Sequence, residues 1–196
     1  MDADTSAGIM EATHRALCEH GYADLTMQRI ADESTMTKAA LHYHFDTKED
    51  LLNAFLDDLL ARFEERLACD ASDPHERLAA FLEAVFAPVD ESDGDDDFAV
   101  ALMELKAQAP YHETYRQRFL ELDERMHDVV ASAVRDGVEA GTFAEEDPGE
   151  VARFVVTVIN GSHARKVALG ENPTETRRII EHYLATTVGW TSGVAA

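Results

Sequence analysis

The chain has 196 residues, a length that allows one continuous helical body or two small domains. Its 39 acidic residues outnumber its 17 basic residues and give a formal net charge of −22. No stretch approaches about 18 uninterrupted apolar residues, and the first residues carry acids where a signal peptide would carry bases. We therefore expect a cytoplasmic protein with neither a membrane span nor a secretion signal.

The two cysteines, Cys18 and Cys69, stand in separate helical segments. Structural thiols of a reduced protein account for them. A redox switch is the alternative reading, but no cluster of basic residues stands beside either thiol to activate it.

Two short helices and a tight turn are predicted between residues 26 and 45. Thr26 can cap the first helix, and residues 34–36 form the turn. Thr37 can cap the second helix, because its hydroxyl group can accept from a free backbone N–H. Leu41 and Phe45 are four residues apart and can face inward together. Such a pair is the smallest unit that presents one helix to a DNA major groove. On periodicity alone, a buried helical hairpin is an equal alternative.

The remaining helices are predicted from their caps and apolar spacing. Thr47 and Asp50 have the spacing of a capping box, and the helix that they open extends to about Cys69. Further helices are expected at 99–108 and 111–140. Three more begin where a capping residue precedes proline, at Asp73-Pro74, Asp147-Pro148 and Asn172-Pro173. With no β-hairpin signal, the sequence predicts an all-α protein of about nine helices.

A run of acidic residues at 90–97 invites comparison with a calcium loop. The spacing fails, because a glycine at loop position six would place Val89 at position one and Val100 at position twelve. We expect a solvated or disordered loop instead.

The nine histidines do not form a metal site by spacing, since no His-x-x-x-His or Cys-x-x-Cys pattern occurs. A nucleophile elbow and a phosphate-binding glycine loop are also absent from the sequence. We therefore expect no enzyme, no cofactor and no metal.

Residues 9 to about 60 resemble the DNA-binding domain of the TetR/AcrR family of transcriptional regulators. The residues that carry this resemblance are Ile9, Ala12, Ala16, Leu17, His20-Gly21-Tyr22, Thr26, Ile30-Ala31, Leu41-His42-Tyr43-His44-Phe45 and Lys48-Glu49-Asp50-Leu51-Leu52. Near the C-terminus, Ile159-Asn160-Gly161 and Leu169-Gly170 match the family's dimerisation helices more loosely.

The resemblance implies a three-helix helix-turn-helix domain at residues 1–50 and a helical effector-binding and dimerisation domain at 51–190. A flexible tail would follow at 191–196, and the helix from Thr47 would link the domains. Two positions depart from the family. Thr35 stands where glycine is usual, which would cost about 1 kcal/mol or more if the turn needs a positive φ. His42 stands where tyrosine is usual and could add pH dependence.

The resemblance also implies the partner, a palindromic operator in double-stranded DNA. Residues expected to touch phosphates are Thr26, Tyr43, His44 and Lys48. Residues expected to face base edges are Thr37, Lys38, Ala39 and His42. Lys38 could read guanine, and Ala39 could pack on a thymine methyl group.

A homodimer is expected, because two reading heads about 34–36 Å apart give usable specificity. The predicted dimer residues are Val151, Phe154, Val155, Val158, Gly161, Ser162, Ile179, Ile180, Tyr183 and Leu184. Their stripes could instead face the monomer's own core.

A small hydrophobic effector is expected to release the operator, as in the family. Its pocket residues would be Phe55, Leu59, Phe63, Phe86, Leu102, Met103, Tyr115, Phe119 and Met126, although each could be ordinary core.

The first fifty residues carry a net negative charge, which is unfavourable for binding a polyanion such as DNA. Ten acids against four bases give this segment a net charge of −6. We hypothesise a cytoplasm of high salt, where acidic surfaces with few lysines stay soluble and repulsion is screened. The alternatives are a mildly acidic protein of ordinary salt, and a helical ligand-binding or adaptor dimer whose DNA-binding head has decayed. An activator fits the sequence as well as a repressor.

Overall fold

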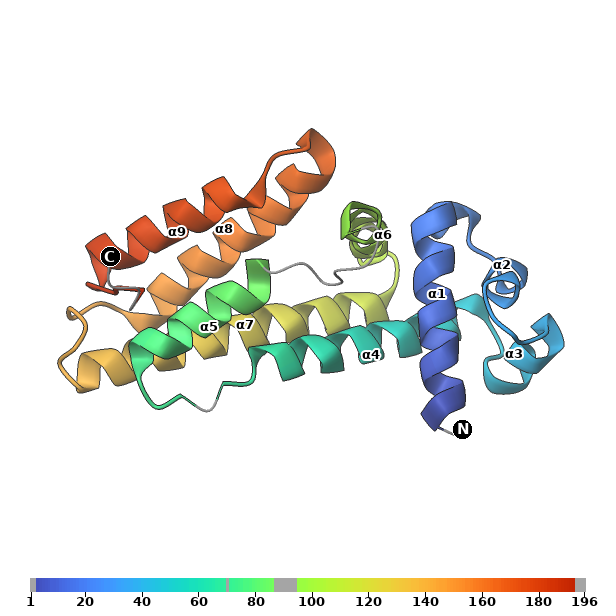
Figure 1. Ribbon diagram of the computed structural model, residues 1–196, viewed down its shortest axis with the longest axis horizontal. Helices are drawn as coiled ribbons and strands as arrows, with labels where there is room; N and C mark the ends of the chain where they lie inside the picture. Colours follow the sequence, from blue (N-terminus) through green and yellow to red (C-terminus); the bar gives the residue numbers. More distant parts are fainter. Residues whose placement is uncertain (1–2, 70, 87–94, 193–196) are drawn as a thin grey trace. The chain divides into compact units, whose positions relative to one another are not determined.

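The computed structural model describes residues 3–69, 71–86 and 95–192. Within these ranges the chain forms nine helices and no strand, as the sequence predicts (Figure 1). The helices are α1 (Ala3–Asp24), α2 (Met27–Asp32), α3 (Lys38–His44), α4 (Lys48–Leu67), α5 (Pro74–Phe86), α6 (Asp95–Gln108), α7 (Glu113–Glu139), α8 (Pro148–Leu169) and α9 (Pro173–Thr187).

The predicted caps are present and explain where the helices begin. Thr47 and Asp50 form the reciprocal capping box: Thr47 N–H donates to Asp50 Oδ2 at 3.1 Å, and Asp50 N–H donates to Thr47 Oγ1 at 3.0 Å. Asp147 Oδ1 accepts from two backbone N–H groups at the start of α8. Asn172 Oδ1 accepts from Thr174 N–H at 2.9 Å at the start of α9.

Two predicted boundaries are wrong. Helix α6 begins at Asp95 rather than at residue 99, so residues 95–97 of the expected acidic loop are helical. Acids are favourable in the first turn of a helix, where backbone N–H groups are unpaired. The rest of that predicted loop, 90–94, lies outside the described residues. Helix α7 begins at Glu113, two residues later than predicted.

The chain packs as two compact units, and each has its own apolar core. Of the described residues, the first unit contains 3–62 and 95–120, and the second contains 63–69, 71–86 and 121–192. Helices α4 and α7 therefore contribute residues to both. The functional boundary expected near residue 50 is a different division, and it stays a prediction. Of the expected tail, residues 193–196 lie outside the described residues, whereas Thr191 N–H donates to His75 Nδ1 at 3.2 Å.

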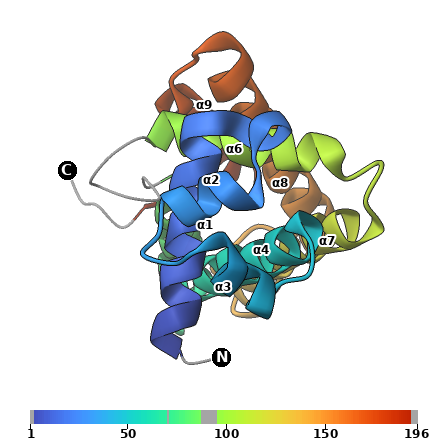
Figure 2. The same cartoon turned by 90° about the vertical axis from the view of Figure 1, so that its right-hand side faces the viewer.

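The core of the first unit joins α1, α2, α3 and the first turns of α4 to α6 and the start of α7. Its most extensive helix contact is between α1 and α6, and Figure 2 shows α6 crossing the C-terminal end of α1. The buried residues include Ile9, Leu17, Ile30, Leu41 and Leu52. Residues more than sixty positions apart in sequence thus hold the helix-turn-helix segment in place.

The second unit is built around α8, which packs against α9. Its core contains apolar residues of α5, α7, α8 and α9, both aliphatic and aromatic. Arg177 of α9 forms ion pairs with Glu83 of α5 at 2.9 Å and with Glu181 at 3.0 Å. Asn160 of α8 donates to Asp123 of α7 at 2.8 Å.

Candidate nucleic-acid interface

The helix-turn-helix segment has the local structure that its sequence predicts. Thr26 Oγ1 accepts from Arg29 N–H at 3.2 Å and caps α2. Thr37 Oγ1 accepts from Ala40 N–H at 3.2 Å and caps α3. Ile30 and Leu41 are fully buried and anchor the two helices to the core. This packing buries the apolar sides of both helices, so their polar sides are available to contact a partner.

The turn between α2 and α3 avoids the strain that Thr35 could have caused. Among the described residues only glycines have positive φ, so Thr35 does not occupy the left-handed region. The Ser34 hydroxyl group organises the turn instead: it donates to the Ala31 carbonyl at 3.0 Å and accepts from Met36 N–H at 3.0 Å. The departure from the family at Thr35 therefore leaves the turn intact.

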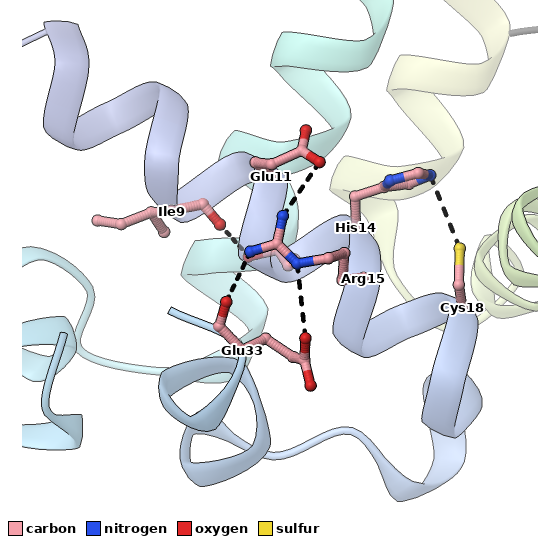
Figure 3. Close-up of polar contacts among 7 residues, drawn as sticks. Ile9, Glu11, His14, Arg15, Cys18 and Glu33 are labelled. Atoms are coloured by element: carbon pink, nitrogen blue, oxygen red, sulfur yellow. Dashed lines mark hydrogen bonds and ion pairs between the residues drawn. The ribbon is translucent and has the colours of Figure 1, made fainter. Parts of the chain in front are cut away.

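Arg15 of α1 holds the end of α2 in position. Its guanidinium donates to the Glu33 carbonyl oxygen at 2.6 Å and also lies 3.5 Å from the Glu33 carboxylate (Figure 3). On the opposite side it pairs with Glu11 at 3.1 Å. Because Glu33 caps α2 at its C-terminus, this contact fixes the direction in which the chain enters the turn. No pattern in the sequence indicated Arg15 as part of this site.

The outer face of α3 is open to solvent. Lys38, Ala39 and His42 are exposed, and the Tyr43 side chain is 86% exposed. His44 is half-buried, and its ring contacts the edge of the Tyr43 ring at 5.2 Å between centroids. Residues 34–45 contain no aspartate or glutamate, although one residue in five of the whole chain is acidic. The face that would approach DNA is therefore spared the negative charge found elsewhere.

Lys48, at the start of α4, is held beside this face by Tyr22. Its ammonium nitrogen lies 4.6 Å from the centre of the Tyr22 ring and donates to the Tyr22 carbonyl at 3.4 Å. The charge therefore has a fixed place at the junction of α3 and α4, as a phosphate contact requires. Burial and the Glu49 carboxylate raise the pKa of the Tyr22 hydroxyl.

Tyr22 is also the residue through which α6 contacts the end of α1. The sequence did not predict this contact. Its backbone N–H donates to Glu104 Oε2 at 2.6 Å. The preceding Gly21 has a φ of 69°, and a Cβ added there would stand 2.9 Å from the same carboxylate oxygen. In the sequence, His20-Gly21-Tyr22 belongs only to the family resemblance. The local signal was the glycine, but nothing near it in the sequence indicated Glu104 as its neighbour.

The predicted effector residues divide between the two cores. Phe55, Leu59, Leu102, Tyr115 and Phe119 belong to the core of the first unit. Phe63, Phe86 and Met126 belong to the core of the second. Met103 is half-buried in α6. The structure thus brings five of the nine together.

The predicted dimer residues divide by exposure. Val151, Val155, Ser162, Ile180 and Leu184 are buried within a single chain. Phe154 is 41% exposed and Ile179 is 51% exposed, while Gly161 is exposed and Val158 and Tyr183 are half-buried. The Phe154 and Tyr183 rings lie 4.0 Å apart between centroids and join α8 to α9.

The part of the chain that the structure describes lacks the features of a metal site and of a membrane span. No three of its metal-ligating side chains gather around one point. None of its helices has the length and apolarity needed to traverse a lipid bilayer. Cys18 and Cys69 are not joined in a disulfide, and the Cys18 sulfur lies 3.7 Å from His14 Nε2.

Comparison with known proteins adds to this geometry. Residues 9–55 match the family described as bacterial regulatory proteins, tetR family, and residues 74–189 match the BetI-type transcriptional repressor, C-terminal. The HTH-type transcriptional repressor AcnR of Corynebacterium diphtheriae is 22% identical over 174 residues, which are 88% of this chain and 86% of that protein. The regulator TtgR of Pseudomonas putida is 36% identical over 89 residues, 42% of this chain and 41% of its own.

Solved structures agree over nearly the whole chain. A TetR transcription regulator from Haloarcula marismortui is 39% identical, with a TM-score of 0.89 over 95% of this chain and all of that one. A putative transcriptional regulator from Saccharomonospora viridis in complex with choline is 20% identical, with a TM-score of 0.83 over 95% of this chain and 98% of that one. The protein is thus a DNA-binding transcriptional regulator without enzymatic activity, and it belongs to the tetR family of bacterial regulatory proteins.

Proposed function

We propose that the protein is a homodimeric repressor of the cytoplasm that reads a palindromic operator with α3. The observation that carries the proposal is the outer face of α3, where Lys38, Ala39 and His42 are exposed on a segment without acids. A short helix with such a face fits the major groove. The name of the Corynebacterium relative favours a repressor over an activator.

The contacts divide by their place in the segment. Thr37, Lys38, Ala39 and His42 stand at the start and outer side of α3 and would face base edges. Thr26, Tyr43, His44 and Lys48 flank that face and would touch phosphates. Lys48 is the best prepared of these, since Tyr22 already holds its side chain.

Dimerisation would use the exposed part of α8 and α9. Phe154, Val158, Gly161, Ile179 and Tyr183 can meet a second copy, with the five buried residues supporting them from behind. Gly161 supports this choice. It lies inside a helix, where glycine costs about 1 kcal/mol relative to alanine, and an added Cβ would meet no atom within 4 Å. Close approach of another helix gives a reason for it.

Release would follow the binding of a small hydrophobic effector by the apolar residues of the first unit. That unit contains both α3 and five of the predicted effector residues. A ligand bound there can change the position of α3 directly, because both belong to the same unit. A small rotation is sufficient, because two heads must match two half-sites of fixed spacing.

High intracellular salt would reconcile the charge with DNA binding. A net charge of −22 repels a polyanion at low ionic strength, but the Debye length falls to about 3 Å at 1 M salt. The similar structure from Haloarcula marismortui supports this proposal. The competing hypothesis, a decayed head, draws on the net charge of −6 in residues 1–50, but the intact turn and the exposed Lys38 speak against it.

Footprinting on the DNA upstream of the protein's own gene tests the proposal. We expect two protected half-sites related by a dyad, with centres about 10 base pairs or a multiple of this apart. A single protected patch without symmetry would contradict the dimeric reading head.

A further inference from the structure

Two buried oxygen atoms of the first unit lack a hydrogen-bond partner in the described part of the chain. They are the hydroxyl oxygen of Tyr115 and the side-chain oxygen of Asn53. Tyr115 is only 1% exposed, so solvent does not reach its hydroxyl group either. Buried polar groups are nearly always paired, because an unpaired one loses its hydration without compensation. A partner that is absent from the free chain would account for both atoms.

An ion pair one turn further along links the two helices that carry Asn53 and Tyr115. Asp57 of α4 pairs with Arg118 of α7. Asn53 lies four residues before Asp57, and Tyr115 lies three residues before Arg118, so each shares a helix face with a member of the pair. The first turns of α4 and α7 run in the same direction in Figure 1. Asn53 and Tyr115 therefore lie one turn before the ion pair, on the same helix faces as its two members.

We infer that the Asn53 amide and the Tyr115 hydroxyl group together bind one hydrogen-bonding group of the effector. The ligand is a neutral molecule with an alcohol, phenol or carbonyl group on an apolar body. The neighbours of Tyr115 in the same core include Phe55, Leu59 and Phe119, which favour an apolar body and would penalise a charged one. The inference rests on the proposed function and narrows its effector from hydrophobic to amphipathic and uncharged.

The hydroxyl group of Tyr115 is suited to donate at neutral pH. Burial, with smaller contributions from Tyr22 and Glu49, raises the pKa of Tyr115 above its ordinary value near 10. The phenol therefore keeps its proton, and the Asn53 oxygen can only accept. One ligand hydroxyl group can satisfy both, because it accepts from Tyr115 and donates to Asn53.

Contacts inside the first unit connect this position to the DNA-binding face. The Tyr115 ring stacks on His112 with 4.9 Å between centroids. His112 Nε2 lies 3.4 Å from the Tyr22 hydroxyl oxygen, and Tyr22 holds Lys48. A ligand that shifts Tyr115 would thus act on Lys48, the predicted phosphate contact, through two intervening residues, His112 and Tyr22.

The test compares 1-naphthol with naphthalene, which has the same apolar body but no hydroxyl group. Both are titrated into the full-length protein in concentrated KCl, and binding is followed by fluorescence. We expect the wild type to bind 1-naphthol about fivefold more tightly, as one net hydrogen bond predicts. Tyr115→Phe and Asn53→Leu should each reduce that ratio to about one. Tyr111→Phe is the matched control, because Tyr111 is 82% exposed, and it should keep the ratio.

Thermal melting separates a ligand contact from a structural one. Tyr115→Phe removes an unpaired buried hydroxyl group, so its melting temperature should equal or exceed that of the wild type. A clearly lower melting temperature would show that the hydroxyl group has a partner in the folded chain, and the inference would fail. It would also fail if the wild type binds both probes equally or neither, or if Tyr115→Phe keeps the preference.

Operator binding by the same proteins distinguishes this inference from the proposed function. If the protein prefers 1-naphthol through Tyr115 but does not bind operator DNA specifically, the ligand site is supported and the proposed repressor function is contradicted. If it binds operator DNA but shows no preference for 1-naphthol, the repressor function is supported and the ligand site is contradicted.

Discussion

Lys38 and Lys48 differ in how each side chain can meet DNA. Lys38 stands at the first position of α3 with an exposed side chain, whereas Tyr22 holds the ammonium group of Lys48. A cation in the first turn of a helix is unfavourable to the helix itself, so Lys38 is better explained by a partner than by folding. The exposed side chain of Lys38 can adjust to a base edge, whereas the ammonium group of Lys48, held in place, can contact a phosphate at a constant position.

The two lysines should therefore give different losses when each is replaced by alanine. Lys38→Ala should reduce the ratio of operator to shuffled-DNA affinity about tenfold. Lys48→Ala should weaken both DNAs about equally and lower the salt dependence of binding by about one charge. Fluorescence anisotropy with both DNAs measures these changes. Lys166→Ala in α8 is the control and should change neither, while an equal loss on both DNAs with Lys38→Ala would contradict its assignment.

The caps of α2 and α3 could be predicted from the sequence because each is a contact within three residues. The contact of Glu104 with Tyr22 N–H could not, since 82 residues separate the partners. The turn at Thr35 shows an intermediate case. The sequence shows that Thr35 replaces the glycine usual in the family. The compensating hydrogen bonds of Ser34, however, depend on a side-chain conformation that the sequence does not specify.

At the scale of helices, the contact of α6 with α1 is the most extensive one in the first unit. Glu104→Ala should lower the free energy of unfolding by about 1–3 kcal/mol, because the Tyr22 N–H loses its partner where water is partly excluded. Urea denaturation followed by circular dichroism measures the loss. Glu19→Ala removes an exposed glutamate of α1 and should change the stability little. Equal effects of both substitutions would show that the contact does not stabilise the head.

Helix α8 should reveal the dimer surface through Gly161. Gly161→Leu should convert the dimer to a monomer with unchanged helix content, because the added side chain meets open space within its own chain. Sedimentation velocity gives the mass, and circular dichroism gives the helix content. Gly8→Leu is the matched control, since a Cβ at Gly8 also meets nothing within 4 Å, and it should remain dimeric. A dimer that survives Gly161→Leu would place the interface elsewhere.

At the scale of the whole chain, the number and order of helices could be predicted but the two units could not. Proline after a capping residue marks α5, α8 and α9 locally. The division into units arises because α6 packs against α1 and because Tyr115, at the start of α7, joins the same core, although both lie far from α1 in the sequence. The effector residues illustrate the consequence: their apolar character was evident, but which of them share a core depends on these distant contacts.

The net charge of −22 should make folding stability depend on salt. Screening weakens self-repulsion of the compact state, and the Debye length falls from about 10 Å at 0.1 M to about 3 Å at 1 M. We expect the melting temperature to rise steadily as KCl is added over this range. A protein of near-zero net charge, melted in the same buffers, controls for effects of KCl on water. Full stability at about 50 mM salt, with no gain on adding KCl, would contradict adaptation to high salt.

The measurement that tests the central claim most directly is binding of the purified protein to its own upstream DNA and to a shuffled copy. Gel retardation should run from about 0.1 to about 3 M KCl, spanning weak to strong screening. The account predicts that the upstream DNA is retarded specifically and that discrimination survives at high salt. A folded dimer that fails to distinguish the two DNAs at any salt concentration would contradict it and favour the decayed head.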